Sequence, residues 1–324
     1  MAAGLNEPLG IAAASGTAVC WAFTALFFSA ASRRIGQYHV NQIRLVIACV
    51  LLSIACAVLQ VYQPVPLNQL VLLGLSGLIG LTLGDAAGFS SLQILGARRA
   101  SLLGALAPGC AAILMIPMLG ESLNWIGVCG MLLTLGGVMW VVLERGQPGE
   151  IHGSATLGIV MGLLGAIGQA GGLIFSKAGM GMTSPDGLMN DIAGVDPSTV
   201  VPISPVLGTL TRMLAGTAIL LGYAVVRGSL GQTWQKLRNR PALAQTSAGA
   251  FFGPFIGVTL SLVAVKYANT AVAATIMGTS PVLVIPIVAI IYKQKVTWRA
   301  VIGAVVAVAG VTILGLRLLI EESL

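Results

Sequence analysis

Long apolar segments alternate with short polar joints along the chain, and this pattern predicts helices that cross a membrane. A helix that spans the hydrocarbon core of a bilayer needs roughly 20 apolar residues. Ten segments satisfy that requirement, at approximately 8–31, 40–62, 69–95, 98–119, 123–143, 156–178, 203–226, 243–267, 270–292 and 298–318. We therefore predict an all-α integral membrane protein with ten transmembrane helices.

The joint at 179–202 is longer and more polar than the others. Three of the ten acidic residues lie in it: Asp186, Asp191 and Asp196. This composition indicates a loop on the surface of the protein. The next longest joints, 144–155 and 227–242, are too short to bury a hydrophobic core of their own, so no separate soluble domain is expected.

Composition supports this prediction, because only 8% of the 324 residues are charged and 56% are hydrophobic. Soluble domains carry about 25% charged residues, so this chain has too little polar surface to cover a water-soluble fold. The net charge is +7, and the basic residues stand in short groups between the apolar segments, such as "SRR", "ARRA" and "QKLRNR". That placement is typical of loops that flank a membrane and argues against nucleic-acid binding.

The later spans of the two halves match when the sequence is shifted by 173 residues. The matched pairs are Gly80 and Gly253, Gly84 and Gly257, Ala100 and Ala273, Pro108 and Pro281, Trp125 and Trp298, and Gly130 and Gly303. Earlier spans match at offsets of 147 and 168, and the second of these offsets pairs Arg44 with Arg212. We therefore predict two related units, 1–145 and 146–324, with loop insertions in the second unit.

Each predicted unit has five spans, and an odd number places consecutive copies in opposite orientations across a bilayer. The expected architecture is therefore two inverted five-helix repeats, related by a pseudo-two-fold axis in the membrane plane. Many secondary transporters have this arrangement, with a substrate site near the midplane that is exposed to the two sides in turn.

The fourth and fifth spans of each unit carry a family resemblance. The first copy reads "ALAPGCAAILMIPMLGE" followed by "WIGVCGMLLTLGGV", and the second reads "GTSPVLVIPIVAIIYKQKVTWRAVIGAVVAVAGV". With the arginine that opens the second span of each unit, these segments resemble the tandem EamA-domain proteins of the drug/metabolite transporter superfamily. One departure is that Gln294 replaces Glu121 in the second copy. The resemblance implies a metabolite carrier with a central cavity lined by spans of both repeats.

Small residues recur every fourth position on the third and eighth spans, so each set forms a strip along one helix face. The strips are Ser76, Gly80, Gly84 and Gly88, and Gly249, Gly253 and Gly257. Helices in a bilayer associate through close packing of such residues. Tight packing is the first interpretation, and sliding of the spans during transport is compatible with it.

Pro108 and Pro281 occupy matching places in the fourth and ninth spans. Proline removes one backbone hydrogen bond and kinks a helix. The pair is a candidate for gating or for lining a cavity. The alternative is that both residues only curve their helices.

Asp85 is the only acidic residue well inside a predicted span. A charge at the bilayer centre costs about 2.5–3.5 kcal/mol on insertion scales, and such residues usually face the protein interior or water. One interpretation is a cavity residue that contacts a substrate amine or takes up a proton. The other is a structural carboxylate that pairs with a basic residue or caps a broken helix. Val258 holds the matching place in the second unit, so either role is asymmetric.

Arg44 and Arg212 open the second and seventh spans, and they are candidates for anchoring an anionic substrate or a helix end. The alternative is that each side chain extends along its helix to interfacial water. We expect that behaviour for Lys177 and Lys266, which end the sixth and eighth spans.

Three further residues on the first and sixth spans are candidates for lining the cavity: Trp21, Thr24 and Gln169. These spans hold matching places in the two units, so a cavity between the units is expected to receive side chains from both. For Trp21, packing against a neighbouring helix is an equal alternative.

No metal site, cofactor or enzymatic activity is expected. The two histidines, His39 and His152, lie at loops. The five cysteines lie inside apolar segments without the spacing of a zinc site or a disulfide framework: Cys20, Cys49, Cys56, Cys110 and Cys129. The sequence also lacks the G-x-x-x-x-G-K-[ST] phosphate loop, so ATP hydrolysis is not expected.

Lysines and arginines divide unevenly between the two sides of the predicted membrane protein. The loops after odd-numbered spans carry twelve of them and the other side carries three. The positive-inside rule then places the odd-numbered loops in the cytoplasm and both termini outside. The family resemblance more often implies cytoplasmic termini. We prefer the charge count, because it concerns this sequence.

These observations predict a secondary transporter of small polar metabolites, such as amino acids or related compounds, in a bacterial inner membrane. The expected partners are a small-molecule substrate and the lipid bilayer, and proton coupling through Asp85 is a further hypothesis. One alternative is an integral-membrane enzyme that modifies lipid, which needs a set of catalytic side chains that the sequence does not show. The other is a membrane protein that binds a partner and transports nothing.

Overall fold

A computed structural model describes residues 7–145, 154–182, 200–283 and 297–322, together with Leu188 and Ile287. Every regular element in this part of the chain is a helix. Nine helical segments there are long and apolar enough to cross a membrane: Glu7–Ile35, Gln37–Val58, Leu67–Leu95, Arg99–Leu119, Trp125–Leu143, Ala155–Gly179, Pro205–Val226, Arg240–Tyr267 and Trp298–Leu316. Nine of the ten predicted spans therefore agree with the structure.

The remaining predicted span, 270–292, is described only over its first part. There it forms a shorter apolar helix, Thr270–Leu283. The rest of this span, and Gln294 after it, lie outside the described residues, as do Asp186, Asp191 and Asp196 in the polar joint. A count of ten helices thus stays a prediction.

The elements follow one another with short joints. In order they are α1 (Glu7–Ile35), α2 (Gln37–Val58), α3 (Leu67–Ser76), η1 (Gly77–Gly84), α4 (Asp85–Gly104), α5 (Ala107–Leu119), α6 (Trp125–Arg145), α7 (Ala155–Gly179), α9 (Pro205–Val226), α10 (Leu230–Lys236), α11 (Arg240–Ala250), η3 (Phe251–Gly257), α12 (Val258–Tyr267), α13 (Thr270–Met277) and α15 (Trp298–Glu322). The η elements are π-helices that join their neighbours without a break, so α3, η1 and α4 form one continuous helix.

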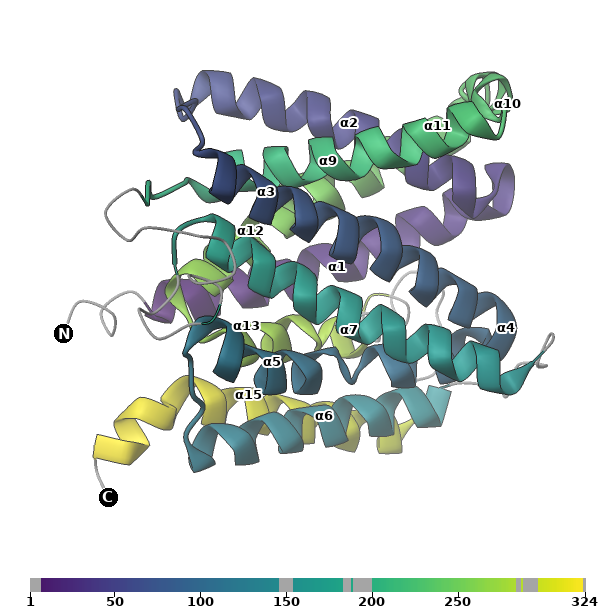
Figure 1. Cartoon of the computed structure of the whole chain (residues 1–324). Coiled ribbons are helices and arrows are strands. Elements are labelled where there is room, and N and C mark those ends of the chain that lie inside the picture. Colours follow the sequence, from purple (N-terminus) through teal and green to yellow (C-terminus); the bar gives the residue numbers. More distant parts are fainter. Residues whose placement is uncertain are drawn as a thin grey trace.

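The helices lie side by side in one bundle, with α6 and α15 paired along one face (Figure 1). These two helices are antiparallel, because Gly130 approaches Gly310 while Gly137 approaches Gly303. A Cβ atom on Gly137 would lie 2.6 Å from the carbonyl oxygen of Gly303, which leaves room only for hydrogen. The glycines matched by the 173-residue shift are thus the ones that let the two helices meet.

One end of the bundle contains the turn between α1 and α2 and the helix α10 that follows α9. Gly36 makes this turn with φ 84°, a left-handed conformation that glycine adopts without strain. Tyr38 and His39 at the start of α2 bond Ser229 and Thr233, at 3.0 and 2.8 Å. Since Ser229 and Thr233 lie just after α9, helices α2 and α9 are antiparallel.

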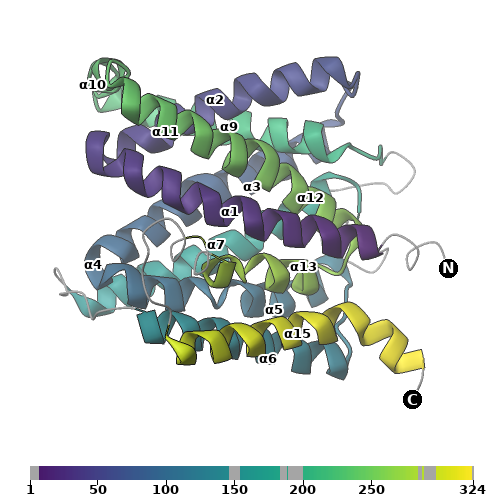
Figure 2. The same cartoon turned by 180° about the vertical axis from the view of Figure 1, so that it is seen from behind.

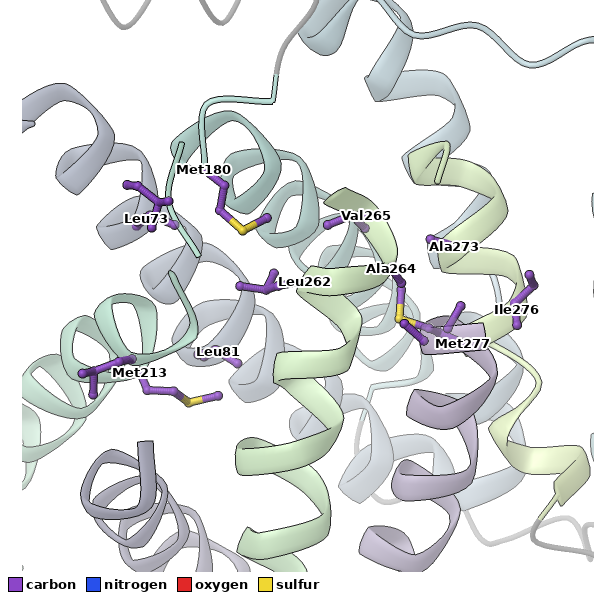
Figure 3. Close-up of a cluster of buried hydrophobic side chains, with 14 of the residues drawn as sticks. Leu73, Leu81, Met180, Met213, Leu262, Ala264, Val265, Ala273, Ile276 and Met277 are labelled. Carbon is purple, nitrogen blue, oxygen red and sulfur yellow. The ribbon is translucent and has the colours of Figure 1, made fainter. Parts of the chain in front are cut away.

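The start of α1 and the end of α15 both lie at the opposite end of the bundle (Figure 2). The largest hydrophobic core cluster lies between the two ends and includes Leu73, Met180, Leu262 and Val265, none of them exposed (Figure 3). Many large apolar side chains point outward instead, among them Ile113, Leu132 and Val305. Such a surface suits contact with lipid rather than water.

Local irregularities recur at matching places in the two halves. The π-helices end at Gly84 and Gly257, which are 173 residues apart, and they precede Asp85 and Val258 respectively. Helix α4 gives way to α5 at 105–106, and α13 is interrupted at 278–279, again 173 residues later. These irregularities therefore share the 173-residue offset found in the sequence.

Pro108 lies directly after the interruption at 105–106, inside the helical segment Arg99–Leu119. It occupies the first turn of α5. Proline suits that position, because the first turn of a helix has no partner for its N–H groups. Pro281 follows the corresponding interruption of α13, and Pro108 packs near Gly278 within it. The two prolines therefore mark paired breaks in the helices.

Candidate functional site

Asp85 lies directly after the π-helix η1, where the chain packs tightly against α7. A Cβ atom on Gly168 would lie 2.7 Å from the Cα atom of Gly84, and one on Gly172 would lie 2.9 Å from that of Gly80. The predicted glycine strip therefore brings two backbones into contact. π-Helical turns are frequent at functional sites, because the extra residue redirects the side chains that follow.

The carboxylate of Asp85 has two direct side-chain partners. The Nη2 atom of Arg44 on α2 lies 2.5 Å from Oδ2, and the Nε2 atom of Gln169 on α7 donates to Oδ1 at 2.8 Å. The exposed fractions of the Arg44 and Asp85 side chains are only 13% and 17%. Of the two interpretations of Asp85, the structure supports the paired carboxylate.

Arg212 on α9 is close enough to be attracted by the charge of the same carboxylate, but the two form no ion pair within 4 Å. Only 4% of Arg212 is exposed, and its Nη2 atom lies beside Gly80 and Gly172, whose missing side chains leave room for it. The expectation that this arginine could extend to interfacial water is therefore wrong. Arg44, Asp85, Gln169 and Arg212, which we call the Asp85 cluster, come from four different helices.

A cavity of about 570 Å³ leads from the turn between α1 and α2 to the Asp85 cluster. It is lined by Ala25, Phe28, Ser29, Ser32, Arg33, Gln37, Val40, Asn41, Arg44, Phe89 and Leu92. Arg33 at its outer part is exposed, as is Gly36 in the neighbouring turn. We call this end of the bundle, with Arg33, Gly36 and Gln37, the open end.

Arg44 is the member of the cluster that lines the cavity. Its guanidinium carbon lies 5.3 Å from the centre of the Phe28 ring, a cation–π contact that fixes its orientation. The Nε atom of Arg44 and the Oδ1 atom of Asn41 are both buried and have no hydrogen-bonding partner among the described residues. A buried polar atom without a partner is costly, so both are suited to a ligand or to water.

Four of the predicted site residues lie elsewhere. Trp21 packs at Gly257, and Thr24 donates to the carbonyl of Cys20 and packs at Gly253, so both support the close contact of α1 with η3. Neither residue lines the cavity or bonds the Asp85 cluster, and neither do Pro108 and Pro281.

The opposite end of the bundle is closed by polar contacts that sequence reasoning missed. Lys177 in the last turn of α7 pairs with Glu121 at 2.5 Å and donates to the carbonyl of Ala268 at 2.9 Å. Glu121 follows Gly120, whose left-handed φ of 66° turns the chain back, and it also accepts from the backbone N–H of Thr270. Lys177 is buried, so its predicted extension to interfacial water is wrong. We call this end, with Glu121, Lys177 and Ala268, the closed end.

Topology could have predicted this pair. The fourth and sixth spans cross the membrane in the same direction, so Glu121 after the fourth and Lys177 at the end of the sixth must reach the same side. Gln69 strengthens the closed end, because its Nε2 atom donates to the carbonyls of Gly179 and Val201 at 3.1 and 2.9 Å.

The cavity lining belongs to the first half of the chain, and the residues that hold the matching places in the second half are packed together. The pairs, at the offsets of 147, 168 and 173, are Ser32 with Gly179, Val40 with Gly208, Phe89 with Leu262, and Leu92 with Val265. A Cβ atom on Gly208 would lie 3.3 Å from Cγ of Met180 and 3.5 Å from Cδ1 of Leu262. Figure 3 shows Met180 and Leu262 side by side in this packed region. One half thus holds a cavity where the other holds a hydrophobic core.

No group of three or more histidine, cysteine, aspartate or glutamate side chains that could hold a metal ion occurs in the described part of the chain. The polar groups of the site are therefore the Asp85 cluster and the cavity lining. These groups can bind and orient a charged small molecule.

Comparison with known proteins agrees with this architecture. The sequence profile of the EamA-like transporter family matches residues 8–143 and 198–316, one segment on each side of residue 145. The chain matches none of the curated proteins. A solved structure described only as "Crystal structure of protein" is similar in fold, with a TM-score of 0.69 and 16% identity over 95% of this chain and 96% of that one.

Proposed function

Because the chain belongs to the EamA-like transporter family and is an integral membrane protein, we propose that it is a secondary transporter of small polar metabolites. Proteins of this family are generally transporters rather than enzymes. The two matched segments then act as inverted repeats, and the substrate site lies between them, where the Asp85 cluster draws residues from both.

One observation carries the proposal: a cavity at the open end corresponds to a packed core at the closed end. If the two repeats exchanged conformations, the region around Met180 and Leu262 would open and the region around Phe28 and Phe89 would close. The Asp85 cluster would then be exposed to the other side of the membrane. Inverted-repeat transporters alternate in this way around a fixed central site.

The antiparallel pairs α2 with α9 and α6 with α15 support this assignment, because matching helices of inverted repeats run in opposite directions. The π-helices and the interrupted helices, each repeated after 173 residues, support it further.

The orientation proposed from charge places the open end in the cytoplasm. The open-end loops are those that follow odd-numbered spans and carry twelve basic residues against three on the other side. In a bacterial inner membrane the cavity would then face inward in this state. A reporter enzyme fused to the C-terminus should be active only outside the cytoplasm, and cytoplasmic activity would refute this orientation.

Transport can be tested by counterflow in liposomes that contain the purified protein. Vesicles are loaded with an unlabelled panel of amino acids, organic acids and related polar metabolites, and uptake of each labelled compound is followed without ATP. We expect at least one labelled compound to accumulate transiently inside the vesicles. Protein-free vesicles are the control.

Absence of counterflow for the whole panel, from protein that unfolds cooperatively on heating, would contradict the proposal. Repeating uptake of the transported compound with and without a pH gradient tests proton coupling. Stimulation that is lost in Asp85→Asn would support it, and identical uptake under both conditions would remove it.

A further inference from the structure

The Asp85 cluster carries an unbalanced positive charge. Arg44 pairs with the single carboxylate of Asp85, and Arg212, whose Nη2 atom lies beside Gly80 and Gly172, is attracted by the same charge without a direct contact. The other acidic side chains that the structure describes, Glu7 and Glu121, act on Lys177 at the closed end. Within the described side chains, the cluster therefore holds one positive charge in excess, in surroundings where an unpaired charge is costly.

This excess charge is presented to the cavity by Arg44. Its Nη2 atom pairs with Asp85, whereas its buried Nε atom has no partner among the described residues. An arginine can bond two oxygens of one carboxylate through parallel N–H groups. Arg212 is buried behind α3–η1 and α7 and does not line the cavity, so Arg44 is the group that an entering anion would meet.

The remaining lining fits a small organic molecule rather than an inorganic ion. The cavity of about 570 Å³ falls within the range typical of small-molecule sites, roughly 300–1,000 Å³. Its walls include the rings of Phe28 and Phe89 and the side chain of Leu92, which suit an apolar portion. Ser29 and Asn41 supply a few polar groups beside them.

Arg33 adds a second positive charge to the lining, at the outer part of the cavity, where its side chain is exposed. None of the described side chains that line the cavity is acidic. A cavity walled by one sign of charge concentrates ligands of the opposite sign.

We propose that the cavity binds small organic carboxylates, with the carboxylate group on Arg44 and the carbon skeleton against Phe28 and Phe89. This inference rests on the proposed transport function and specifies the substrate class of the same site. The bound carboxylate supplies the negative charge that the cluster lacks. An ammonium group on the ligand is not required, because Asp85 is already paired with Arg44 and Gln169.

The test uses four compounds with one carbon skeleton. 4-Methylpentanoate has a carboxylate alone, leucine has a carboxylate and an ammonium group, leucinamide has an ammonium group alone, and 4-methylpentanamide has neither. Thermal unfolding of the purified full-length protein is followed as each compound is added, since a ligand that binds only the folded state stabilises it by mass action. We expect the two carboxylates to raise the unfolding temperature in a concentration-dependent way and the other two to have no effect.

Variants assign the effect to Arg44. Arg44→Gln removes the guanidinium that an entering anion would meet and leaves Asp85 with Arg212, so the positive and negative charges of the cluster are equal in number. We expect this variant to bind 4-methylpentanoate at least about tenfold more weakly, the loss expected for one charge-assisted hydrogen bond. Arg33→Gln, which changes only the exposed arginine at the outer part of the cavity, should keep most of the stabilisation.

Three results would overturn the inference: no stabilisation by either carboxylate, equal stabilisation by 4-methylpentanamide or leucinamide, or full stabilisation of the Arg44→Gln variant. These results are distinct from failure of the proposed function. If counterflow succeeds with a neutral or cationic metabolite while carboxylates do not bind, the carrier remains and the substrate class is wrong.

Discussion

Asp85 receives its two arginines from opposite ends of the bundle. Arg44 lies seven residues into α2, which starts at the open end, and Arg212 lies seven residues into α9, which starts near the closed end. Seven residues of helix span about 10 Å, so each arginine reaches well into the membrane. The carboxylate thus pairs with Arg44 of the first half and attracts Arg212 at the matching position of the second half. The position that matches Asp85 is occupied by Val258, so the second half has no corresponding carboxylate.

A thermodynamic cycle tests this ion pair. Removing one partner of a buried pair costs roughly 3–5 kcal/mol, because the other charge is left without compensation. Asp85→Asn should be the more harmful single change, since it leaves two guanidinium groups unpaired, whereas Arg44→Gln leaves Asp85 with Arg212. The unfolding temperature should fall in the order wild type, Arg44→Gln, Asp85→Asn. The double variant should lose less unfolding free energy than the two single variants lose together.

Strict additivity of the two changes would show that Arg44 and Asp85 do not interact in the folded protein. A wild-type unfolding temperature for Asp85→Asn would contradict the account even more directly.

Several residue roles could be anticipated from sequence and others could not. Asp85, Arg44, Arg212 and Gln169 were all candidates because charged and polar groups are costly inside a bilayer, and the structure brings the four together. Phe28 escaped notice, because an aromatic residue in an apolar helix carries no signal of a cavity. Its role depends on the space left beside it by neighbouring helices.

At the scale of helices, hydropathy located the spans because length and apolar character suffice to identify them. The predicted 69–95 corresponds to Leu67–Leu95, and 156–178 to Ala155–Gly179. The π-helices could not be predicted this way, since a π-turn differs from an α-turn by one residue and leaves hydropathy unchanged. The glycine strips signalled close packing but not this local change of hydrogen bonding.

Neighbouring glycines on α6 provide a matched test of close packing. Gly137 is buried against α15, and a Cβ atom there would collide with the backbone of Gly303 and Ala307. Gly136 is exposed, and a Cβ atom there would meet nothing within 4 Å. We expect Gly137→Ala to destabilise the protein by about 1–3 kcal/mol through overpacking. Gly136→Ala should leave the unfolding temperature unchanged or slightly raised. Equal effects would contradict the packing of α6 on α15.

At the scale of the whole molecule, the two halves are alike in backbone and different in what they enclose. Matching residues line a cavity at the open end and a packed core at the closed end, where Lys177, Glu121 and Gln69 add polar contacts. The repeat could be recognised from sequence. Which of the two sets of matching residues lines a cavity could not, because that depends on how neighbouring helices pack around each set rather than on any one residue type.

Distances across the two ends of the bundle test the account's central claim, that the ends open in turn. Spin labels are placed at Arg34 and Gln93 on either side of the cavity, and in a second sample at Val201 and Lys266 beside the packed region. All four sites are fully or partly exposed, and the native cysteines are replaced beforehand. The labelled proteins are reconstituted in liposomes, and those retaining counterflow are measured.

A compound that shows counterflow should shorten the Arg34–Gln93 distance in part of the population and lengthen the Val201–Lys266 distance in a similar fraction. Glu121→Gln, which removes the partner of Lys177, should shift both distances the same way without any compound. If both distances stay fixed in protein that performs counterflow, alternating access between these two ends is wrong.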